Sequence, residues 1–316
     1  MGYRKYHDAH PMTPNLTRSE FMFNGSIVAL ATPFTDHDGL DGAALDALVD
    51  FHLQQGSDGL VVAGTTGESA TLLRDEFETL LAAVVRRVAG RIPVLAGTGS
   101  ASTAVAVRQT RRAGELGADG VLVVTPYYVR PTQAGLRAHF TAVADAAAVP
   151  VVLYNVPART AVDMLPETVA ALAAHPRIVG IKEAAGAQGR IEELRARCGP
   201  DFTVLSGDDR SCLAAMKSGA DGVISVAANV APALLHALCA AAAGHDWSAA
   251  ERLDARLQPL FEALSLETNP IPVKWALFEM QLAGPGIRLP LTPMEPVHRQ
   301  AVRHGLKALG LALRDE

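Results

Sequence analysis

The stretch Ile178-Val179-Gly180-Ile181-Lys182-Glu183 decides the fold, because apolar and small residues run directly into a lysine. His175-Pro176 precedes it, and a short β-branched run bounded in this way predicts a buried parallel strand. Side-chain alternation predicts that Ile178, Gly180 and Lys182 share one face of the strand. If the strand belongs to a closed barrel, Lys182 points inward at its C-terminal end.

Lys182 then has two interpretations. Partial desolvation favours a neutral amine, which attacks a carbonyl carbon. A strand-end lysine can also reach water with its long side chain and have no chemical role. Lysine is scarce in this chain, occurring only at positions 5, 182, 217, 274 and 307, so a lysine that ends a buried strand gains weight.

The length and composition limit which classes of protein this chain can belong to. A chain of 316 residues that is 49% hydrophobic can bury a large core in one large domain or two smaller ones. The net charge of −5 argues against a nucleic-acid partner and offers no basic patch to a membrane. Cys198, Cys212 and Cys239 form no CxxC pair, which disfavours a disulfide framework or a cysteine zinc site and fits a reducing cytoplasm.

Eight apolar segments alternate with amphipathic helical segments from Gly25 onward. The predicted strands are Ser26–Ala31, Gly59–Ala63, Pro93–Ala96, Gly120–Val124, Pro150–Tyr154, Ile178–Lys182, Thr203–Ser206 and Gly222–Val226. Apolar residues three and four apart predict helices over Ala43–Gln55, Arg74–Ala89 and Ala104–Leu116. Eight β/α units favour a TIM (β/α)8 barrel over an open sheet. No GxGxxG opens the first helix, which disfavours a dinucleotide-binding fold.

The pattern after Val226 is helical only, and it predicts a C-terminal helical appendage. The expected helices are Ala233–Ala243, Trp247–Leu266, Pro272–Leu282 and Pro296–Leu313, with Asn269-Pro270-Ile271-Pro272 as a stiff connector. The expected division is a disordered leader over residues 1–21, a catalytic barrel over 22–245 and a helical domain over 246–316. No apolar segment is long enough to span a bilayer.

Chemistry in such a barrel collects where the strands end. The second predicted strand runs into Gly64-Thr65-Thr66-Gly67-Glu68, where a tight turn and a helix start would expose backbone N–H groups to a carboxylate. Thr65 and Glu68 also match a capping box, which is the structural alternative.

Three of the five tyrosines follow the fourth and fifth strands, at positions 127, 128 and 154. Tyr154 lies on the strand before Lys182, near enough to exchange protons with it, although packing with one hydrogen bond is the plainer interpretation. Arg159 offers a planar fork for a second carboxylate, or pairs with a helix C-terminus.

Gly207-Asp208-Asp209 follows the seventh strand. Two carboxylates at a strand end can hold a metal ion. No histidine ends a neighbouring strand, so a loop and N-cap role is favoured and no metal is expected.

These residue types together permit a specific chemistry. An inward lysine forms an imine with a ketone, hydroxyl groups move protons, and N–H groups and an arginine hold two carboxylates. This set predicts a class I, Schiff-base aldolase or lyase that acts on a 2-oxo acid without a metal or organic cofactor.

At these motifs the sequence resembles the dihydrodipicolinate synthase and N-acetylneuraminate lyase family, from Phe23 almost to the C-terminus. The matching motifs are Gly64–Ser69, Thr125–Tyr128 with Arg130-Pro131, Tyr154–Pro157 with Arg159-Thr160, Lys182-Glu183 and Gly207–Asp209. The resemblance implies a TIM barrel and a homotetramer built from tight dimers.

Site roles follow from the resemblance by position. It implies that Lys182 forms an imine with pyruvate, that Tyr154 donates and accepts the proton, and that Thr65 and Tyr128 complete a relay. Tyr128 would enter from a neighbouring subunit. The resemblance also implies that Thr66 binds the carboxylate of pyruvate and that Arg159 binds the carboxylate of L-aspartate-4-semialdehyde. It places Gly207 in the site and implies that the backbone of Ile224 lines it.

Two features bear on the branch of the family. Arg159 favours the synthases, because the neuraminate lyases and sugar-acid aldolases usually lack an arginine at that place. An aldolase or lyase for another 2-oxo acid, such as N-acetylneuraminate or a 2-oxo-3-deoxy sugar acid, stays an alternative, and a barrel that binds a keto acid without turnover is a second.

The positions of the family's lysine-inhibition site depart from the inhibited pattern. Ser69, Ala70 and Tyr127 match, while Ala101 replaces an amide and Val105 a carboxylate, and Arg74 and Phe77 replace histidines. An ammonium ligand would lose its anionic partner and meet a cation, so the sequence predicts weak or absent inhibition by lysine.

Overall fold

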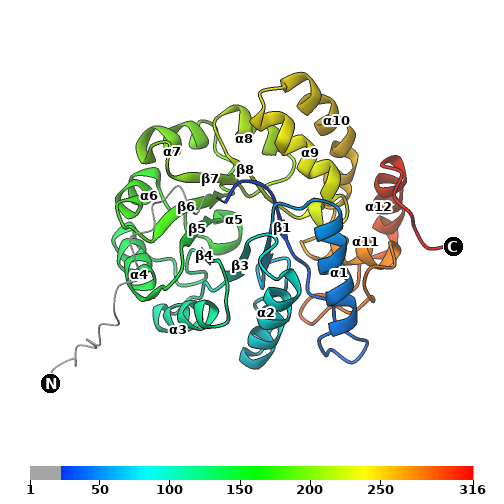
Figure 1. The fold of residues 1–316 in the computed structure, drawn as a ribbon, viewed down its shortest axis with the longest axis horizontal. Helices are drawn as coiled ribbons and strands as arrows, with labels where there is room; N and C mark the ends of the chain where they lie inside the picture. The colour runs from blue at the N-terminus through cyan, green and yellow to red at the C-terminus, as the bar shows by residue number, and fades with distance from the viewer. Residues whose placement is uncertain (1–22, 316) are drawn as a thin grey trace.

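Eight parallel strands close into a barrel in the computed structural model, which describes residues 23–315 (Figure 1). The strands are β1 Gly25–Ala29, β2 Gly59–Val62, β3 Val94–Gly97, β4 Gly120–Val124, β5 Val151–Asn155, β6 Ile178–Glu183, β7 Thr203–Ser206 and β8 Gly222–Ser225. Each predicted strand is confirmed to within two residues at either end. The predicted leader, residues 1–21, lies outside the described residues.

Pairing between β1 and β8 closes the barrel, with Gly25 opposite Gly222. Gly222 has φ +151°, and a Cβ atom there would lie 2.1 Å from the carbonyl oxygen of Gly25. Only glycine therefore allows the two strands to approach at the point where the sheet meets itself.

The register between β5 and β6 shifts by one residue and corrects the predicted alternation. Val151 pairs with Ile178, but Val152 pairs with Gly180, so that β6 holds an extra residue at this point. Ile178 consequently packs in the outer layer, and Val179 packs inside the barrel. The prediction for Ile178 was wrong because strict alternation of side chains assumes that the strand has no bulge. Lys182 lies after the bulge and points into the barrel, as predicted.

Helices follow the strands and cover the barrel's outer surface (Figure 1). The helical segments of the described chain are α1 Gly42–Gln54, α2 Arg74–Val88, α3 Thr103–Glu115, α4 Gln133–Ala146, α5 Pro157–Thr160, α6 Pro166–Ala173, α7 Arg190–Cys198, α8 Cys212–Lys217, the 3₁₀ turn η2 Ala227–Asn229, α9 Pro232–Ala243, α10 Trp247–Ala263, α11 Ile271–Glu279 and α12 Pro296–Ala308. Local signals start several of them: Asp41 accepts from the backbone N–H of Ala44, and Thr132 accepts from that of Gly135.

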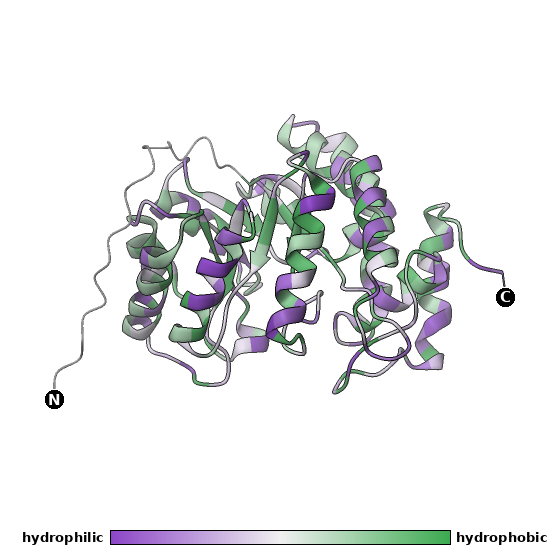
Figure 2. Ribbon diagram, turned by 60° about the horizontal axis from the view of Figure 1, so that its bottom comes forward, coloured by the Kyte–Doolittle hydropathy of each residue, from purple (hydrophilic) through white to green (hydrophobic). Residues whose placement is uncertain are grey.

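The apolar residues form two layers. One fills the barrel interior and includes Ile27, Leu95, Val152 and Ile224, while the larger one lies between the strands and the surrounding helices. Figure 2 shows the same division, with hydrophobic strands in the centre and hydrophilic residues on the helices around them. Burial of this area is the main stabilising contribution to such a fold.

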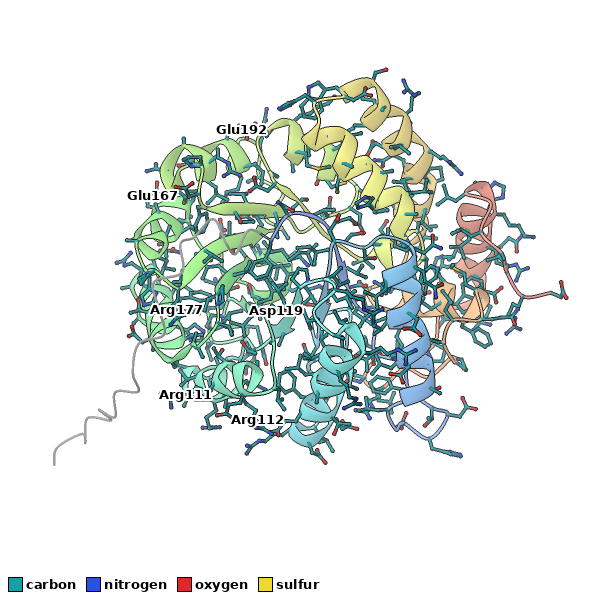
Figure 3. All side chains as sticks on the ribbon, in the orientation of Figure 1. Arg111, Arg112, Asp119, Glu167, Arg177 and Glu192 are labelled. Atoms are coloured by element: carbon teal, nitrogen blue, oxygen red, sulfur yellow. The ribbon has the colours of Figure 1, made fainter. Side chains whose placement is uncertain are left out.

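Charged residues such as Arg112, Glu167 and Glu192 lie on the outer helices around the barrel (Figure 3). Arg112 on α3 donates to Glu78 on α2 at 2.8 Å, and Arg197 on α7 donates to Glu167 on α6 at 3.0 Å. Exposed ion pairs of this kind contribute little to stability, so they join neighbouring helices without supporting the barrel.

The predicted C-terminal helices are present. Helix α9 packs on β1 and completes the outer ring, α10 packs on α9, and α12 packs on both α10 and α11. The proposed domain boundary between residues 245 and 246 stays a prediction. Across residues 23–315, the helices are all too short or too polar to cross a membrane.

His52 on α1 makes the fold sensitive to acid. Its ring is fully buried, with Nδ1 3.2 Å from the Ser57 hydroxyl, and desolvation lowers its pKa from 6.5 to about 3. Between about pH 6.5 and pH 3, His52 therefore binds a proton in the unfolded chain but not in the folded chain. The free energy of unfolding consequently falls as the pH drops below about 6.5 and stops falling near pH 3. The loss at pH 5 should be about 2 kcal/mol.

We predict that His52→Gln removes this part of the acid sensitivity. Urea unfolding at pH 7.5 and pH 5 should show a fall in unfolding free energy about 2 kcal/mol larger for the wild type than for the variant. Equal falls in the two proteins would contradict the assignment of this proton to His52.

Candidate active site

Seven of the eight predicted site residues line one cavity of about 800 Å³ at the C-terminal ends of the strands. They are Thr65, Thr66, Tyr154, Arg159, Lys182, Gly207 and Ile224. The eighth, Tyr128, is not among the lining residues. In (β/α)8-barrel enzymes the active site lies at this end of the barrel.

Lys182 and Tyr154 lie side by side in the lining of this cavity. They are directly paired in the β5–β6 register, and Lys182 Nζ lies 4.5 Å from the centre of the Tyr154 ring. Lys182 is only 6% exposed. A buried amine that faces a cavity, with a phenol beside it, can attack a ketone carbon and has a proton donor within reach.

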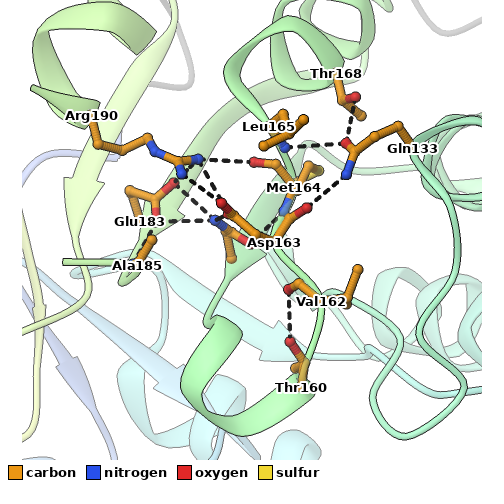
Figure 4. A network of polar contacts seen from close by, with 11 residues as sticks. Gln133, Thr160, Val162, Asp163, Met164, Leu165, Thr168, Glu183, Ala185 and Arg190 are labelled. Atoms are coloured by element: carbon orange, nitrogen blue, oxygen red, sulfur yellow. Dashed lines mark hydrogen bonds and ion pairs between the residues drawn. The ribbon is translucent and has the colours of Figure 1, made fainter. Parts of the chain in front are cut away.

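The residues after this pair, Asn155 and Glu183, lie on the opposite face of the two strands by side-chain alternation. Glu183 belongs there to a network of polar contacts around Asp163 and Arg190 (Figure 4). Asn155 Nδ2 donates to both carboxylate oxygens of Glu183 at 3.1 Å, and its Oδ1 accepts from the backbone N–H of Met164. Glu183 also accepts from the backbone N–H of Ala185. The inner pair, Tyr154 and Lys182, and the outer pair, Asn155 and Glu183, thus fix the same register from both sides of the sheet.

Asp163 and Arg190 extend this outer network. Arg190 donates to both carboxylate oxygens of Asp163, at 2.6 and 3.2 Å, and its Nη1 lies 3.9 Å from Glu183. Burial raises the pKa of Glu183, and the amide of Asn155 and the nearby guanidinium oppose that shift. This network was not predicted from the sequence, although Asn155 and Glu183 both stand in the motifs that match the family.

The loop after β2 corrects one prediction. No helix starts at Thr65, because residues 65–71 form turns, with the N–H of Glu68 donating to Thr65 and that of Ser69 to Gly64. Helix α2 begins later, at Arg74. The capping contact there is made by Glu76, which accepts from the backbone N–H of Leu73 at 2.8 Å. The capping-box interpretation of Thr65 and Glu68 was therefore wrong.

Thr65 and Thr66 still present donors to the cavity. Within residues 23–315, no group accepts a hydrogen bond from their two backbone N–H groups. Two adjacent unpaired N–H groups on one turn form a natural site for an anion such as a carboxylate. The turn can therefore do what the predicted helix start was expected to do.

Asn269, from the C-terminal part of the chain, joins two sides of the cavity. Its side chain donates to the Thr66 hydroxyl at 3.0 Å, and its carbonyl oxygen accepts from Arg159 Nη2 at 3.1 Å. This residue was predicted only as part of a connector. The signal that could have found it is a polar residue placed just before the apolar start of α11.

Gly207 and Ile224 shape the space around the lysine. A Cβ atom at Gly207 would lie 3.0 Å from Lys182 Cε and 2.7 Å from the Ala184 side chain. Ile224 on β8 is buried in the barrel interior and also lines the cavity. The absence of a side chain at Gly207 is thus what leaves room for Lys182.

Tyr128 stands apart from the other predicted residues. It is 90% exposed, has φ +70°, and follows Tyr127 in a segment whose next residue, Val129, is also exposed. A positive φ is unusual for a bulky residue and is worth a functional explanation. Nothing within the described chain brings its side chain to the cavity.

Asp208 and Asp209 have the predicted loop role, but the N-cap of α8 is Ser211, so the N-cap part of the prediction was wrong. Asp208 accepts from the N–H and the hydroxyl of Ser211, and Asp209 accepts from the backbone N–H groups of Val226 and Ala227. Burial raises the pKa of Asp209. In the described part of the chain, no three His, Cys, Asp or Glu side chains gather where they could hold a metal ion.

Together these features define a class of protein: a (β/α)8 barrel with a buried lysine in the lining of a cavity at the C-terminal ends of its strands. The sequence profile of the dihydrodipicolinate synthetase family matches residues 22–309. A 4-hydroxy-tetrahydrodipicolinate synthase of Methylococcus capsulatus is 52% identical over 290 residues, which is 92% of this chain and 100% of the relative.

Solved structures agree with the sequence relatives. The chloride-inhibited dihydrodipicolinate synthase of Acinetobacter baumannii, complexed with pyruvate, has a TM-score of 0.91 at 45% identity over 92% of this chain and 100% of its own. The enzyme of Cyanidioschyzon merolae with lysine bound has a TM-score of 0.89 at 39% identity, over 92% and 99%. The chain belongs to the dihydrodipicolinate synthetase family and is a lyase.

We predict that Gly207→Ala lowers kcat/KM by about a hundredfold, because the added methyl group displaces the Lys182 side chain and small displacements of reacting groups have effects of that size. The measurement is the steady-state rate, with circular dichroism to check the fold. Gly42→Ala is the matched control, since a Cβ at Gly42 meets nothing within 4 Å. Rates for Gly207→Ala equal to those of the control would contradict the steric role.

Proposed function

We propose that this protein condenses pyruvate with L-aspartate-4-semialdehyde to 4-hydroxy-tetrahydrodipicolinate through an imine on Lys182. The single observation that carries the proposal is the buried Lys182 amine in the lining of the cavity, in register with Tyr154. The name of the Methylococcus capsulatus relative and the pyruvate complex of the Acinetobacter baumannii relative support the product and the first substrate.

The chemistry begins with attack of Lys182 Nζ on C2 of pyruvate. The carbonyl oxygen takes up protons and leaves as water, and an imine remains. Loss of a proton from C3 gives an enamine, whose C3 forms a carbon–carbon bond with the aldehyde carbon while the aldehyde oxygen takes up a proton. The amine of the semialdehyde then attacks the imine carbon, closes the ring and releases Lys182. Tyr154 is the proposed donor and acceptor of these protons.

Two carboxylates need partners in this reaction. The pyruvate carboxylate is assigned to the loop of Thr65 and Thr66, supported by the two backbone N–H groups that no described residue engages. Arg159, held by the carbonyl oxygen of Asn269, is assigned to the carboxylate of the semialdehyde. The backbone of Ile224 lines the pyruvate site, and Gly207 leaves space for the lysine.

The relay is proposed to include Thr65 and a Tyr128 that enters from a second copy of the chain. The exposure of Tyr128 and its positive φ support a partner that covers this segment. We propose a homotetramer built as a dimer of dimers. The pathway assigned is lysine and diaminopimelate biosynthesis, in the cytoplasm, where the free cysteines at 198, 212 and 239 fit a reducing compartment.

Borohydride reduction in the presence of pyruvate tests the proposal. The reduced imine should add the mass of a three-carbon acid to the peptide that contains Lys182, and Lys182→Arg should show no addition because a guanidinium forms no imine. A wild-type protein that is not labelled, or is labelled at another lysine, would remove the basis of the mechanism.

The second substrate is tested by comparing rates. Turnover with pyruvate and L-aspartate-4-semialdehyde should exceed cleavage of N-acetylneuraminate or 2-oxo-3-deoxygluconate by at least a hundredfold. The reason is that Arg159 offers a guanidinium where those substrates carry hydroxyl groups. A faster reaction with either sugar acid would shift the assignment to an aldolase of the same fold.

We predict that lysine does not inhibit the enzyme at submillimolar concentration. Arg74 is exposed and paired with Glu78, Phe77 is buried, and neither Ala101 nor Val105 offers a charge to an ammonium group. Initial rates measured over a range of lysine concentrations check this expectation. Half-inhibition below 1 mM would show that other groups replace the lost anionic partner.

A further inference from the structure

The carboxylate-binding loop, residues 64–71, contains a buried charge that the proposed mechanism does not use. The side chain of Glu68 is fully buried, and its backbone has φ +54°. A left-handed conformation is unfavourable for a residue other than glycine, and it persists only where surrounding contacts enforce it. Glu68 lies two residues after Thr66, so whatever enforces its position also governs the loop.

The partner of Glu68 comes from the C-terminal helices. Lys274 on α11 is 4% exposed and donates through Nζ to Glu68 Oε1. The same ammonium group lies over the ring of Phe34, 4.3 Å from its centre. The chain has few lysines, and this one stands among apolar residues of α11. No role was predicted for it from the sequence.

A second cation secures the other side of the loop. The backbone N–H of Arg288 donates to Glu68 Oε2 at 3.0 Å, and its guanidinium donates to Glu76 and to the carbonyl oxygen of Thr71. Both carboxylate oxygens of Glu68 are therefore engaged by groups from beyond the barrel. Thr71 in turn donates to the carbonyl oxygen of Glu68, which joins the two ends of the turn.

The start of α11 reaches the loop at two points. Asn269 donates to the Thr66 hydroxyl, and Lys274, five residues later, pairs with Glu68. On the barrel side, the Thr32 hydroxyl donates to the carbonyl oxygen of Gly67 at 2.8 Å. The loop is thus held between the end of β1 and the C-terminal segment.

We propose that Glu68 and Lys274 are positioning residues for the substrate site: their ion pair lets α11 set the place of Thr65 and Thr66. The inference rests on the proposed function, because it assumes that this loop receives the pyruvate carboxylate. The C-terminal helices then complete the reaction site, in addition to packing on the barrel.

Removal of either partner has a defined consequence. A buried charge without its counterion is strongly unfavourable, so the loop with Glu68 and the start of α11 with Lys274 no longer stay together, and the remaining charge moves toward water. Such a movement withdraws the Thr65 and Thr66 N–H groups from the substrate carboxylate. Lys182 is held by the β5–β6 register and is not displaced, so the amine stays reactive toward ketones without a carboxylate.

The test uses Lys274→Met and Glu68→Gln, with Glu279→Gln as the matched control. Glu279 lies on α11 like Lys274, is equally buried and pairs with Arg303 on α12, but it has no contact with the loop. Each protein is treated with borohydride and either pyruvate or methyl pyruvate, which has a neutral ester in place of the carboxylate. Melting temperature checks the fold, and Glu68→Gln keeps the side-chain shape if Lys274→Met does not fold.

The half-saturating concentration of pyruvate should rise at least tenfold in both loop variants and stay within twofold of the wild type in Glu279→Gln. Trapping by methyl pyruvate should be unchanged in all three. Equal behaviour of the loop variants and the control, or an equal loss with both ketones, would overturn the positioning role.

Amide hydrogen exchange separates this inference from the proposed function. Residues 64–71 should exchange at least tenfold faster in the two loop variants than in Glu279→Gln, whether or not an imine forms. Failure of the wild type to trap either ketone would refute the imine mechanism alone. Unchanged exchange in the loop variants would refute the positioning role alone.

Discussion

Parallel pairing of β5 with β6 is the constraint on which the site depends. The register places Tyr154 opposite Lys182 inside the barrel and Asn155 opposite Glu183 outside it. The inner pair faces the cavity, while the outer pair joins Asp163 and Arg190 in a network of hydrogen bonds (Figure 4). A slip by one residue would exchange the two faces. Lysine and tyrosine would then meet the helical layer, and a carboxylate and an amide would face the substrate.

The C-terminal helices contribute to the same site from the other side. Asn269 bridges Thr66 and Arg159, and Lys274 pairs with the buried Glu68. Asn269 and Thr66 are 203 positions apart in the sequence, Lys274 and Glu68 are 206 apart, and Asn269 and Arg159 are 110 apart. In a barrel of this kind the chemistry takes place at the C-terminal ends of the strands, and here a later segment of the chain contacts one of the loops at those ends. The extra helices are therefore better described as one wall of the reaction site than as an attachment.

Much of this could be predicted from the sequence, because the signals are local. Eight apolar runs with helical periodicity between them define the barrel, and the residues at the strand ends define most of the cavity lining. The bulge at Val179 could not be predicted, since it depends on how β6 meets β5. The loop at Thr65 was misjudged because Glu68 resembles a capping residue locally, whereas its partners, Lys274 and the backbone of Arg288, lie about two hundred residues further along the chain.

The most direct test of the central claim is a crystal structure of the protein soaked with pyruvate. Continuous electron density from Lys182 Nζ to C2 of a three-carbon acid is expected, with the acid's carboxylate beside the N–H groups of Thr65 and Thr66. Pyruvate bound without a covalent link to Lys182, or with its carboxylate away from that loop, would contradict the mechanism and the site as described.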